Sequence, residues 1–142
     1  MVLNEKGIIK QFDLVIYPLD FVVVIGADLV DEVDKEYKPF ESKYSGFNPP
    51  CKETPAATFN VIQKVTEKPC IMVWFNSLED CKGSHFCHEV IHSALEIFKF
   101  IGAEVDVDNQ EPFAYLSGNL FRLLNGAFYE FRDYKPKITK KK

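Results

Sequence analysis

The chain has 142 residues, of which 46% are hydrophobic and 27% are charged. This length supports one domain with a single hydrophobic core, and the balance of residues is typical of a globular protein. The net charge is -4, but five lysines lie in the last eight residues, so the rest of the chain carries -9. We therefore predict one domain over residues 1–134, followed by a basic, flexible tail over 135–142. The acidic body would repel a phosphate backbone, which argues against nucleic-acid binding by the folded part.

Neither a signal peptide nor a membrane span is visible in the sequence. The first ten residues are of mixed polarity, and the apolar run 21–27 is too short to cross a bilayer. The four cysteines form no CxxC pair and no regular framework, so we expect their thiols to be reduced. The sequence therefore predicts a protein that does not associate with a membrane and acts inside a cell.

The N-terminal part of the chain predicts two strands and a short helix. Residues 12–17 and 21–26 are rich in β-branched and aromatic side chains, with a turn between them. Residues 28–37 have a helical pattern, with Asp28 as its expected N-cap. The segment 38–55 contains four prolines, so we expect a long loop there.

Two more strands and two long helices are predicted in the C-terminal part. The strands fall at 57–66 and 70–75. From residue 84 the apolar residues recur at helical steps, and Gly102 is expected to end this helix at the C′ position. A last helix is expected from about 109 to 131, with Pro112 in its first turn. The order β-β-α-β-β-α-α predicts an α+β domain in which a small, mostly antiparallel sheet packs on these two helices.

The sequence His88-Glu89-x-x-His92 on the first of the long helices is the strongest functional signal. Residues four apart share one helix face, so both imidazoles can reach one zinc ion at about 2.0–2.1 Å. Glu89 lies about 100° round the helix from His88, beside the ion. That position suits a catalytic base that takes a proton from a zinc-activated water molecule. The motif therefore predicts a Zn²⁺ site with Glu89 as its base.

A catalytic zinc site also needs a third protein ligand and an open position. Glu111 is our prediction, because it follows His92 by 19 residues and begins the last helix. A helical hairpin would bring that helix start back towards the motif. Glu104, Asp106 and Asp108 in the connecting loop are the alternatives.

Other residues are candidates for roles around the metal. Tyr115 shares the helix face of Glu111, and we expect it either to donate a hydrogen bond to a developing oxyanion or to pack as a core aromatic. The strand 70–76 is expected to border the cleft, where a substrate peptide would add to its edge. Trp74 would then either line the cleft or lie in the core.

Two competing interpretations of the motif need no catalytic zinc. The first is a closed structural metal site made of Cys81, His85, Cys87 and His88, although its spacing is irregular and its last two residues point about 100° apart on a helix. The second is an accidental motif in a core helix. Two histidines at this spacing around a glutamate are a rare chance event in a chain with only three histidines.

Three stretches carry a resemblance to a known family, at residues 72–75, 87–92 and 109–116. They resemble small bacteriophage proteins in which a strand ending in Trp-Phe precedes an HExxH helix, and their pattern is similar to that of gluzincin metallopeptidases. The resemblance implies a minimal zincin-like fold, with His88, His92 and Glu111 as zinc ligands and Glu89 as base. It also implies a location in the host bacterial cytoplasm or in a phage particle. The chain lacks a counterpart of the large substrate-binding subdomain of familiar gluzincins.

The leading hypothesis from the sequence is a zinc-dependent metallopeptidase that acts on a protein or peptide substrate. The alternative is a non-catalytic zinc-binding phage protein, either a virion component or a binder of a host factor. Glu89 discriminates between the two, because a purely structural zinc site does not need that carboxylate. The sequence does not indicate an oligomeric state.

Overall fold

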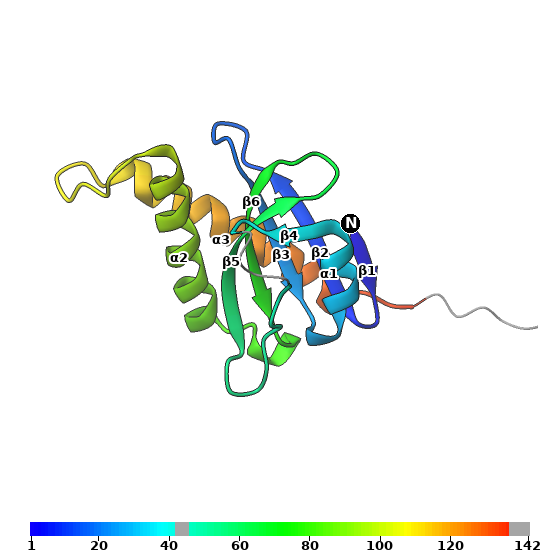
Figure 1. The fold of residues 1–142 in the computed structure, drawn as a ribbon. Coiled ribbons are helices and arrows are strands. Elements are labelled where there is room, and N and C mark those ends of the chain that lie inside the picture. The colour runs from blue at the N-terminus through cyan, green and yellow to red at the C-terminus, as the bar shows by residue number, and fades with distance from the viewer. Residues whose placement is uncertain (42–45, 137–142) are drawn as a thin grey trace, which may run out of the picture.

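The computed structural model describes residues 1–41 and 46–136. In these residues, six strands form one sheet in the order β1-β2-β3-β6-β5-β4, and three α-helices pack on it (Figure 1). The strands are β1 (Val2–Asn4), β2 (Gly7–Asp13), β3 (Asp20–Ile25), β4 (Tyr37–Pro39), β5 (Ala56–Gln63) and β6 (Pro69–Phe75), and the helices are α1 (Val30–Glu36), α2 (Gly83–Ile101) and α3 (Glu111–Arg132). Four of the five strand pairs are antiparallel, and β3 and β6 are parallel. The α+β class with a mostly antiparallel sheet is therefore confirmed, whereas residues 137–142 of the expected tail lie outside the described residues.

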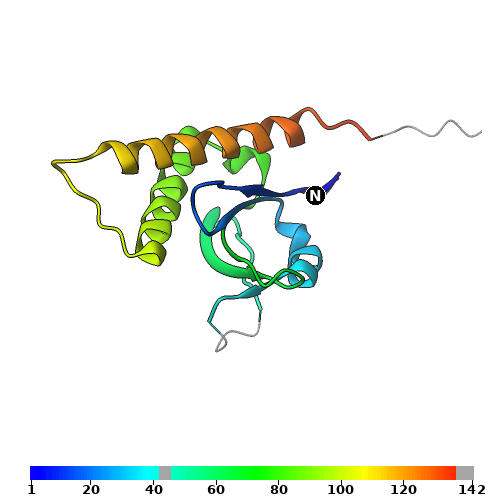
Figure 2. The ribbon, with the colours of Figure 1, turned by 90° about the horizontal axis from the view of Figure 1, so that it is seen from above.

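The two central strands divide the core into two layers. Side chains alternate along β3, so that Phe21 and Val23 face α2 and α3, whereas Val22 and Val24 face the side of α1. Figure 2 shows α3 lying across one face of the sheet, with α1 on the opposite side. Because β3 and β6 are buried on both faces, their sequences are almost continuously apolar.

Helix α2 begins and ends close to its predicted limits. Its buried face packs on the sheet and on α3, and it is made of Phe86, Val90, Ala94 and Ile97. Gly102 ends the helix in the left-handed conformation, with φ of 73°, and its N–H is directed to the carbonyl of Lys99. The predicted C′ glycine is confirmed, and Figure 2 shows that the loop after it projects beyond the sheet.

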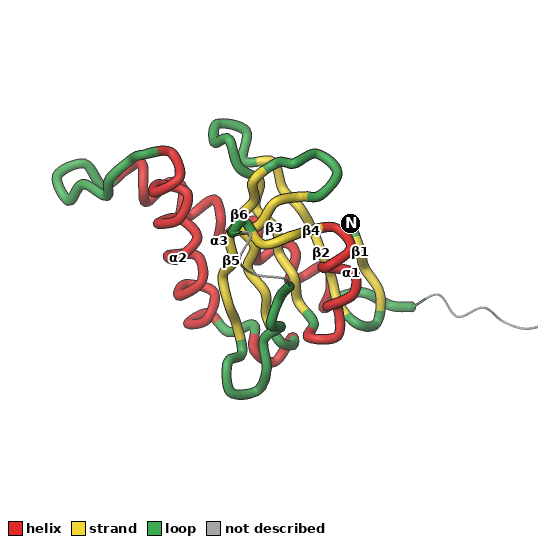
Figure 3. The backbone as a smooth tube through the Cα atoms, in the orientation of Figure 1, coloured by secondary structure: helices red, strands yellow, loops and turns green. Residues whose placement is uncertain are grey.

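The N-terminal elements differ from the prediction. Strand β2 ends at Asp13, whose Oδ1 accepts the N–H of Val15 at 2.7 Å, so the expected strand 12–17 is wrong and its second half forms an exposed turn (Figure 3). Strands β1 and β4 were not predicted, and β4 begins at the last residue of the predicted helix 28–37 and runs into the segment 38–55, which was expected to be a loop. Asp28 caps no helix, because it lies in a 3₁₀ turn and Leu29 is the N-cap of α1.

Two findings bear on the expectations about a membrane span and about the cysteines. Within the described residues, none of the helices has the length and apolar character needed to cross a bilayer. The four cysteines all lie in the described part of the chain, and none of them is paired in a disulfide.

Candidate metal centre

Helix α2 brings His88 and His92 together on one face. Their ring centroids are 4.7 Å apart, and their Nε2 atoms are separated by 3.1 Å. Both side chains are exposed, and that of His88 is 67% exposed. Two ligands that bind a tetrahedral zinc ion at about 2.0–2.1 Å stand about 3.3 Å apart. The two nitrogens are therefore close to the separation that a shared zinc ion requires.

Glu89 is buried next to this pair, with only 5% of the residue exposed. The hydroxyl of Thr58 on β5 donates a hydrogen bond to Oε2 of Glu89. The other carboxylate oxygen, Oε1, lies 3.9 Å from Nε2 of His88. A buried carboxylate is costly unless it receives hydrogen bonds, so Thr58 both stabilises Glu89 and fixes which of its oxygens is turned towards the histidines. No pattern in the sequence links these two residues, which are 31 positions apart.

A cavity of about 290 Å³ opens between α2 and β5 at this point, and we call it the histidine cavity. Its lining residues are Ala56, Ala57, Thr58, Asn60, His88, Glu89, His92 and Glu96. On its far side, Nδ2 of Asn60 donates to Oε2 of Glu96 at 3.1 Å. The cavity therefore contains two imidazoles and two carboxylates, contributed by a single helix, and strand β5 closes it from the other side.

Strand β5 borders the histidine cavity. The expectation that strand 70–76 would border the cleft is therefore wrong. Strand β6 lies between β3 and β5, and it contributes no residue to the histidine cavity. Trp74 is fully buried in the layer on the α1 side, and its Nε1 donates to the carbonyl of Gly26 at 2.9 Å. Of the two alternatives for Trp74, the core position is the one observed.

Glu111 and Tyr115 are not brought to the histidines. The start of α3 lies beside the last turns of α2, as the contact between the rings of Phe98 and Phe113 at 5.5 Å shows. Because Phe98 is six residues after His92, this contact lies about 9 Å further along the helix axis. Glu111 is exposed, Tyr115 is 75% exposed, and neither lines the histidine cavity. Tyr115 is therefore not a core aromatic, and the hairpin leaves Glu111 outside the histidine cavity.

The competing metal sites are not assembled either. Among the described residues, no three His, Cys, Asp or Glu side chains form a group that could hold a metal ion. Glu104, Asp106 and Asp108, the alternatives for the third ligand, therefore form no such group with the histidines. In the proposed structural site, the thiol of Cys81 donates to the carbonyl of Ser77, and Nδ1 of His85 lies 2.7 Å from the carbonyl of Asp80. Burial raises the pKa of the Cys81 thiol to about 12.

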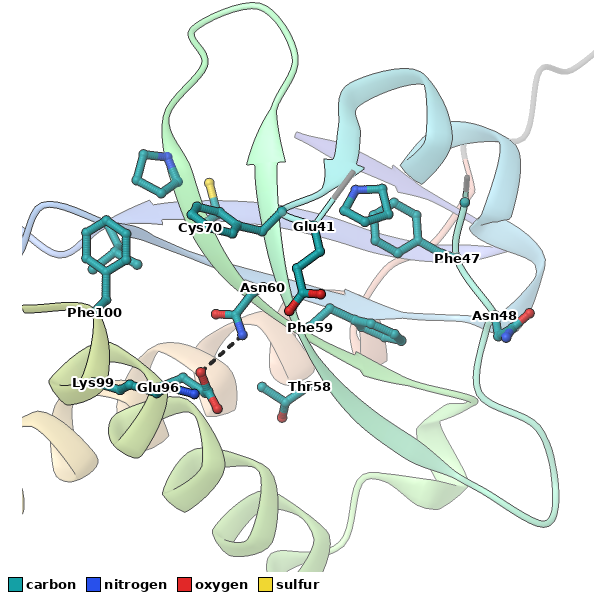
Figure 4. A pocket seen from close by; sticks show the side chains of 15 residues that line it. Glu41, Phe47, Asn48, Thr58, Phe59, Asn60, Cys70, Glu96, Lys99 and Phe100 are labelled. Carbon is teal, nitrogen blue, oxygen red and sulfur yellow. Dashed lines mark hydrogen bonds between the residues drawn. The ribbon is translucent and has the colours of Figure 1, made fainter. Parts of the chain in front are cut away.

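A second cavity, of about 600 Å³, adjoins the first one, and we call it the apolar cavity (Figure 4). It lies between the C-terminal half of α2 and strands β4 and β5. Thr58, Asn60 and Glu96 line both cavities. The sequence did not predict the apolar cavity, because its walls come from segments that are far apart in the chain and meet only in the folded protein.

Comparisons with models of known families, with curated proteins and with solved structures found no match to this chain. The relation to bacteriophage proteins and to gluzincins therefore stays a prediction from the residues that carry the resemblance. What the fold itself provides is a pair of converging imidazoles, a buried carboxylate and an adjoining apolar cavity.

Proposed function

We propose that the chain is a zinc-dependent hydrolase that cleaves peptide bonds, with His88 and His92 as metal ligands and Glu89 as the base. The observation that carries the proposal is the convergence of the two Nε2 atoms, 3.1 Å apart, beside the buried Glu89 carboxylate. Histidine pairs suit zinc among the common divalent metals. A zinc ion in this place would polarise a peptide carbonyl and make a water molecule more acidic.

His88 and His92 would supply two of the three protein ligands that a catalytic zinc ion needs. The third ligand is one of two acids. Glu96 is the acid that shares the histidine cavity, and it follows His92 by one helical turn. Glu111 is the acid that the resemblance implies, and it would need the start of α3 to move. Both residues are therefore included in the experiment below.

The position of Glu89 supports the role of a base. Because Thr58 occupies Oε2, the oxygen that is available for a proton is Oε1, on the side of His88. The carboxylate is held between a helix and a strand, so it needs little rearrangement before it acts. A base must lie within hydrogen-bonding reach of the proton that it takes, and a water molecule held at the histidine pair would meet that condition.

Strand β5 supports a peptide as the substrate. Strand β4 pairs only with its residues 61–63, and the N–H of Phe40 then donates to the carbonyl of Asn60 at 3.0 Å. By alternation along the strand, the backbone groups of Thr58 and Ala56 point to the same edge. Among the described residues, the backbone hydrogen bonds leave this edge of Thr58 and Ala56 without a partner, and a substrate peptide that paired with it would extend the sheet. Its backbone would then pass next to Glu89.

Metal content, measured by elemental mass spectrometry, tests the ligand assignment. We expect about one zinc ion per chain in the wild type and in Glu89→Gln, and loss of zinc in His92→Ala. His85→Ala is the matched control, because His85 lies on the same helix but outside the histidine cavity, and this variant should keep its zinc. Glu96→Ala and Glu111→Ala identify the third ligand, because only the variant that lacks this ligand should lose the metal. A wild type without zinc after reconstitution would contradict the proposal.

Catalysis is tested by incubating zinc-loaded protein with a peptide library and detecting new termini. Removal of a general base typically slows a reaction by about 10²–10⁴-fold, so Glu89→Gln should lose nearly all cleavage while it keeps its zinc. If the wild type holds zinc but cleaves no peptide, the site serves a non-catalytic zinc-binding protein and the peptidase proposal fails.

A further inference from the structure

The apolar cavity has aromatic rings that are partly exposed. Phe40, which follows β4, and Phe100 on α2 pack edge to face with their centroids 6.4 Å apart, yet they remain 47% and 46% exposed. Phe59 on β5 and Leu19 add to the apolar lining. Figure 4 shows the rings of Phe100 and Phe59 on two sides of the cavity, with Asn60 and Glu96 between them. Accessible rings grouped in a cavity of this size are typical of a ligand site.

The apolar cavity shares three lining residues with the histidine cavity. The hydrogen bond between Asn60 and Glu96 lies at the junction, because both residues line both cavities. Thr58, which fixes Glu89, also lines both. Both cavities therefore border the same stretch of β5, and an extended ligand along that stretch would reach both of them.

We propose, on the basis of the peptidase function above, that the apolar cavity is the specificity pocket and takes a large apolar side chain of a peptide bound beside β5. Every second side chain of an extended peptide points to the same side, at intervals of about 6.6–6.8 Å. One such side chain can enter the apolar cavity while the backbone passes the histidine pair. The charged groups of the lining, Glu41, Glu96 and Lys99, are of both signs, whereas the rings of Phe40, Phe59 and Phe100 supply apolar contact for an aromatic or long aliphatic side chain.

The binding step is tested separately from cleavage in the Glu89→Gln protein, which keeps the pocket and should not cleave. The probes are a blocked alanine peptide and the same peptide with one central phenylalanine, titrated by ¹H–¹⁵N NMR. Burial of the phenylalanine ring should tighten binding by about 10- to 100-fold. The shifted resonances should include those of Phe40, Phe59 and Phe100.

Phe100→Ser and Ile101→Ser form a matched pair in the same background. The two residues are neighbours at the end of α2 with similar exposure, 46% and 41%, but only Phe100 lines the apolar cavity. Phe100→Ser should remove the preference for the phenylalanine peptide, and Ile101→Ser should keep it. Circular dichroism melts of both variants check that the fold is intact, and Phe40→Ser provides a second test if Phe100→Ser is unfolded.

The outcomes separate this inference from the proposed function. Equal affinity for the two peptides, shifts outside the apolar cavity, or equal effects of the two serine variants would overturn the specificity pocket. If the wild type cleaves peptides without preferring apolar residues, the peptidase stands and the pocket assignment fails. If the phenylalanine peptide binds in the cavity but the wild type cleaves nothing, the pocket stands as a peptide-binding site and the peptidase proposal fails.

Discussion

Replacement of Thr58 by valine should destabilise the fold through Glu89. Valine has nearly the shape of threonine but lacks the hydroxyl that donates to Oε2 of Glu89. The carboxylate would remain buried at 5% exposure and lose this hydrogen bond. Hydrogen bonds to charged groups contribute about 1.5–3 kcal/mol. The added methyl group offsets a few tenths of this, so we expect a loss of about 1–2.5 kcal/mol in the free energy of unfolding.

Urea unfolding followed by fluorescence measures this loss directly, because Trp74 is the single tryptophan of the chain and is fully buried. With a urea m-value of about 2 kcal/mol per M, the midpoint should fall by about 0.5–1.2 M. Thr66→Val is the matched control. The hydroxyl of Thr66 donates to Oε1 of Gln63 at 3.1 Å, but the residue is exposed, so the change should stay within about 0.5 kcal/mol.

A double-mutant cycle with Glu89→Leu isolates the hydrogen bond. If Thr58 stabilises the fold through its hydrogen bond to the carboxylate, the hydroxyl contributes nothing once the carboxylate is removed. The two substitutions should then show a coupling energy of about 1–2.5 kcal/mol. Additive effects in this cycle, or a Thr58→Val protein as stable as the Thr66→Val control, would refute the reasoning.

Two further predictions concern the core. Trp74→Phe leaves the carbonyl of Gly26 without its buried donor and opens a gap in the core. The free energy of unfolding should fall by about 2–4 kcal/mol. A loss of less than about 1 kcal/mol in a thermal melt followed by circular dichroism would contradict this. Burial raises the pKa of the Cys81 thiol to about 12, whereas an unfolded thiol ionises near 8.5. The native state therefore holds this proton longer, and stability should fall as the pH rises above about 8.5, by up to about 1.4 kcal/mol per pH unit. In urea unfolding at several pH values, Cys81→Ala should reduce that slope, and an unchanged slope would count against the prediction.

The elements that the sequence predicted best are those with local signals. Helix α2 follows from a helical apolar period and from the glycine at position 102, which adopts the left-handed conformation that ends it. Strands β1 and β4 have three residues each, too few for any period, and they exist because they pair with longer neighbours. The end of β2 was misplaced, because a β-branched run continues into a turn that Asp13 stabilises by accepting the N–H of Val15.

The candidate site also contains residues placed by local structure and residues placed by tertiary packing. His88, Glu89 and His92 lie on one helical segment, so their relative placement follows from helix geometry alone. Thr58 depends on how β5 packs against α2, and the position of Glu111 depends on where the hairpin between α2 and α3 closes. The number of residues between His92 and Glu111 allowed a close approach, but ring packing between α2 and α3 places the start of α3 further along the helix.

The two faces of α2 make the metal experiment interpretable. The buried face packs on the sheet and on α3, whereas His88 and His92 are exposed and are not members of that core. Substitution of an exposed histidine should change stability by no more than about 0.5 kcal/mol, so loss of zinc in His92→Ala reports the loss of a ligand and not unfolding. Glu89 is different, because it is buried and hydrogen-bonded. Glutamine is the appropriate replacement, since its carbonyl oxygen can still accept the hydrogen bond of Thr58 while it can no longer take a proton as a carboxylate does.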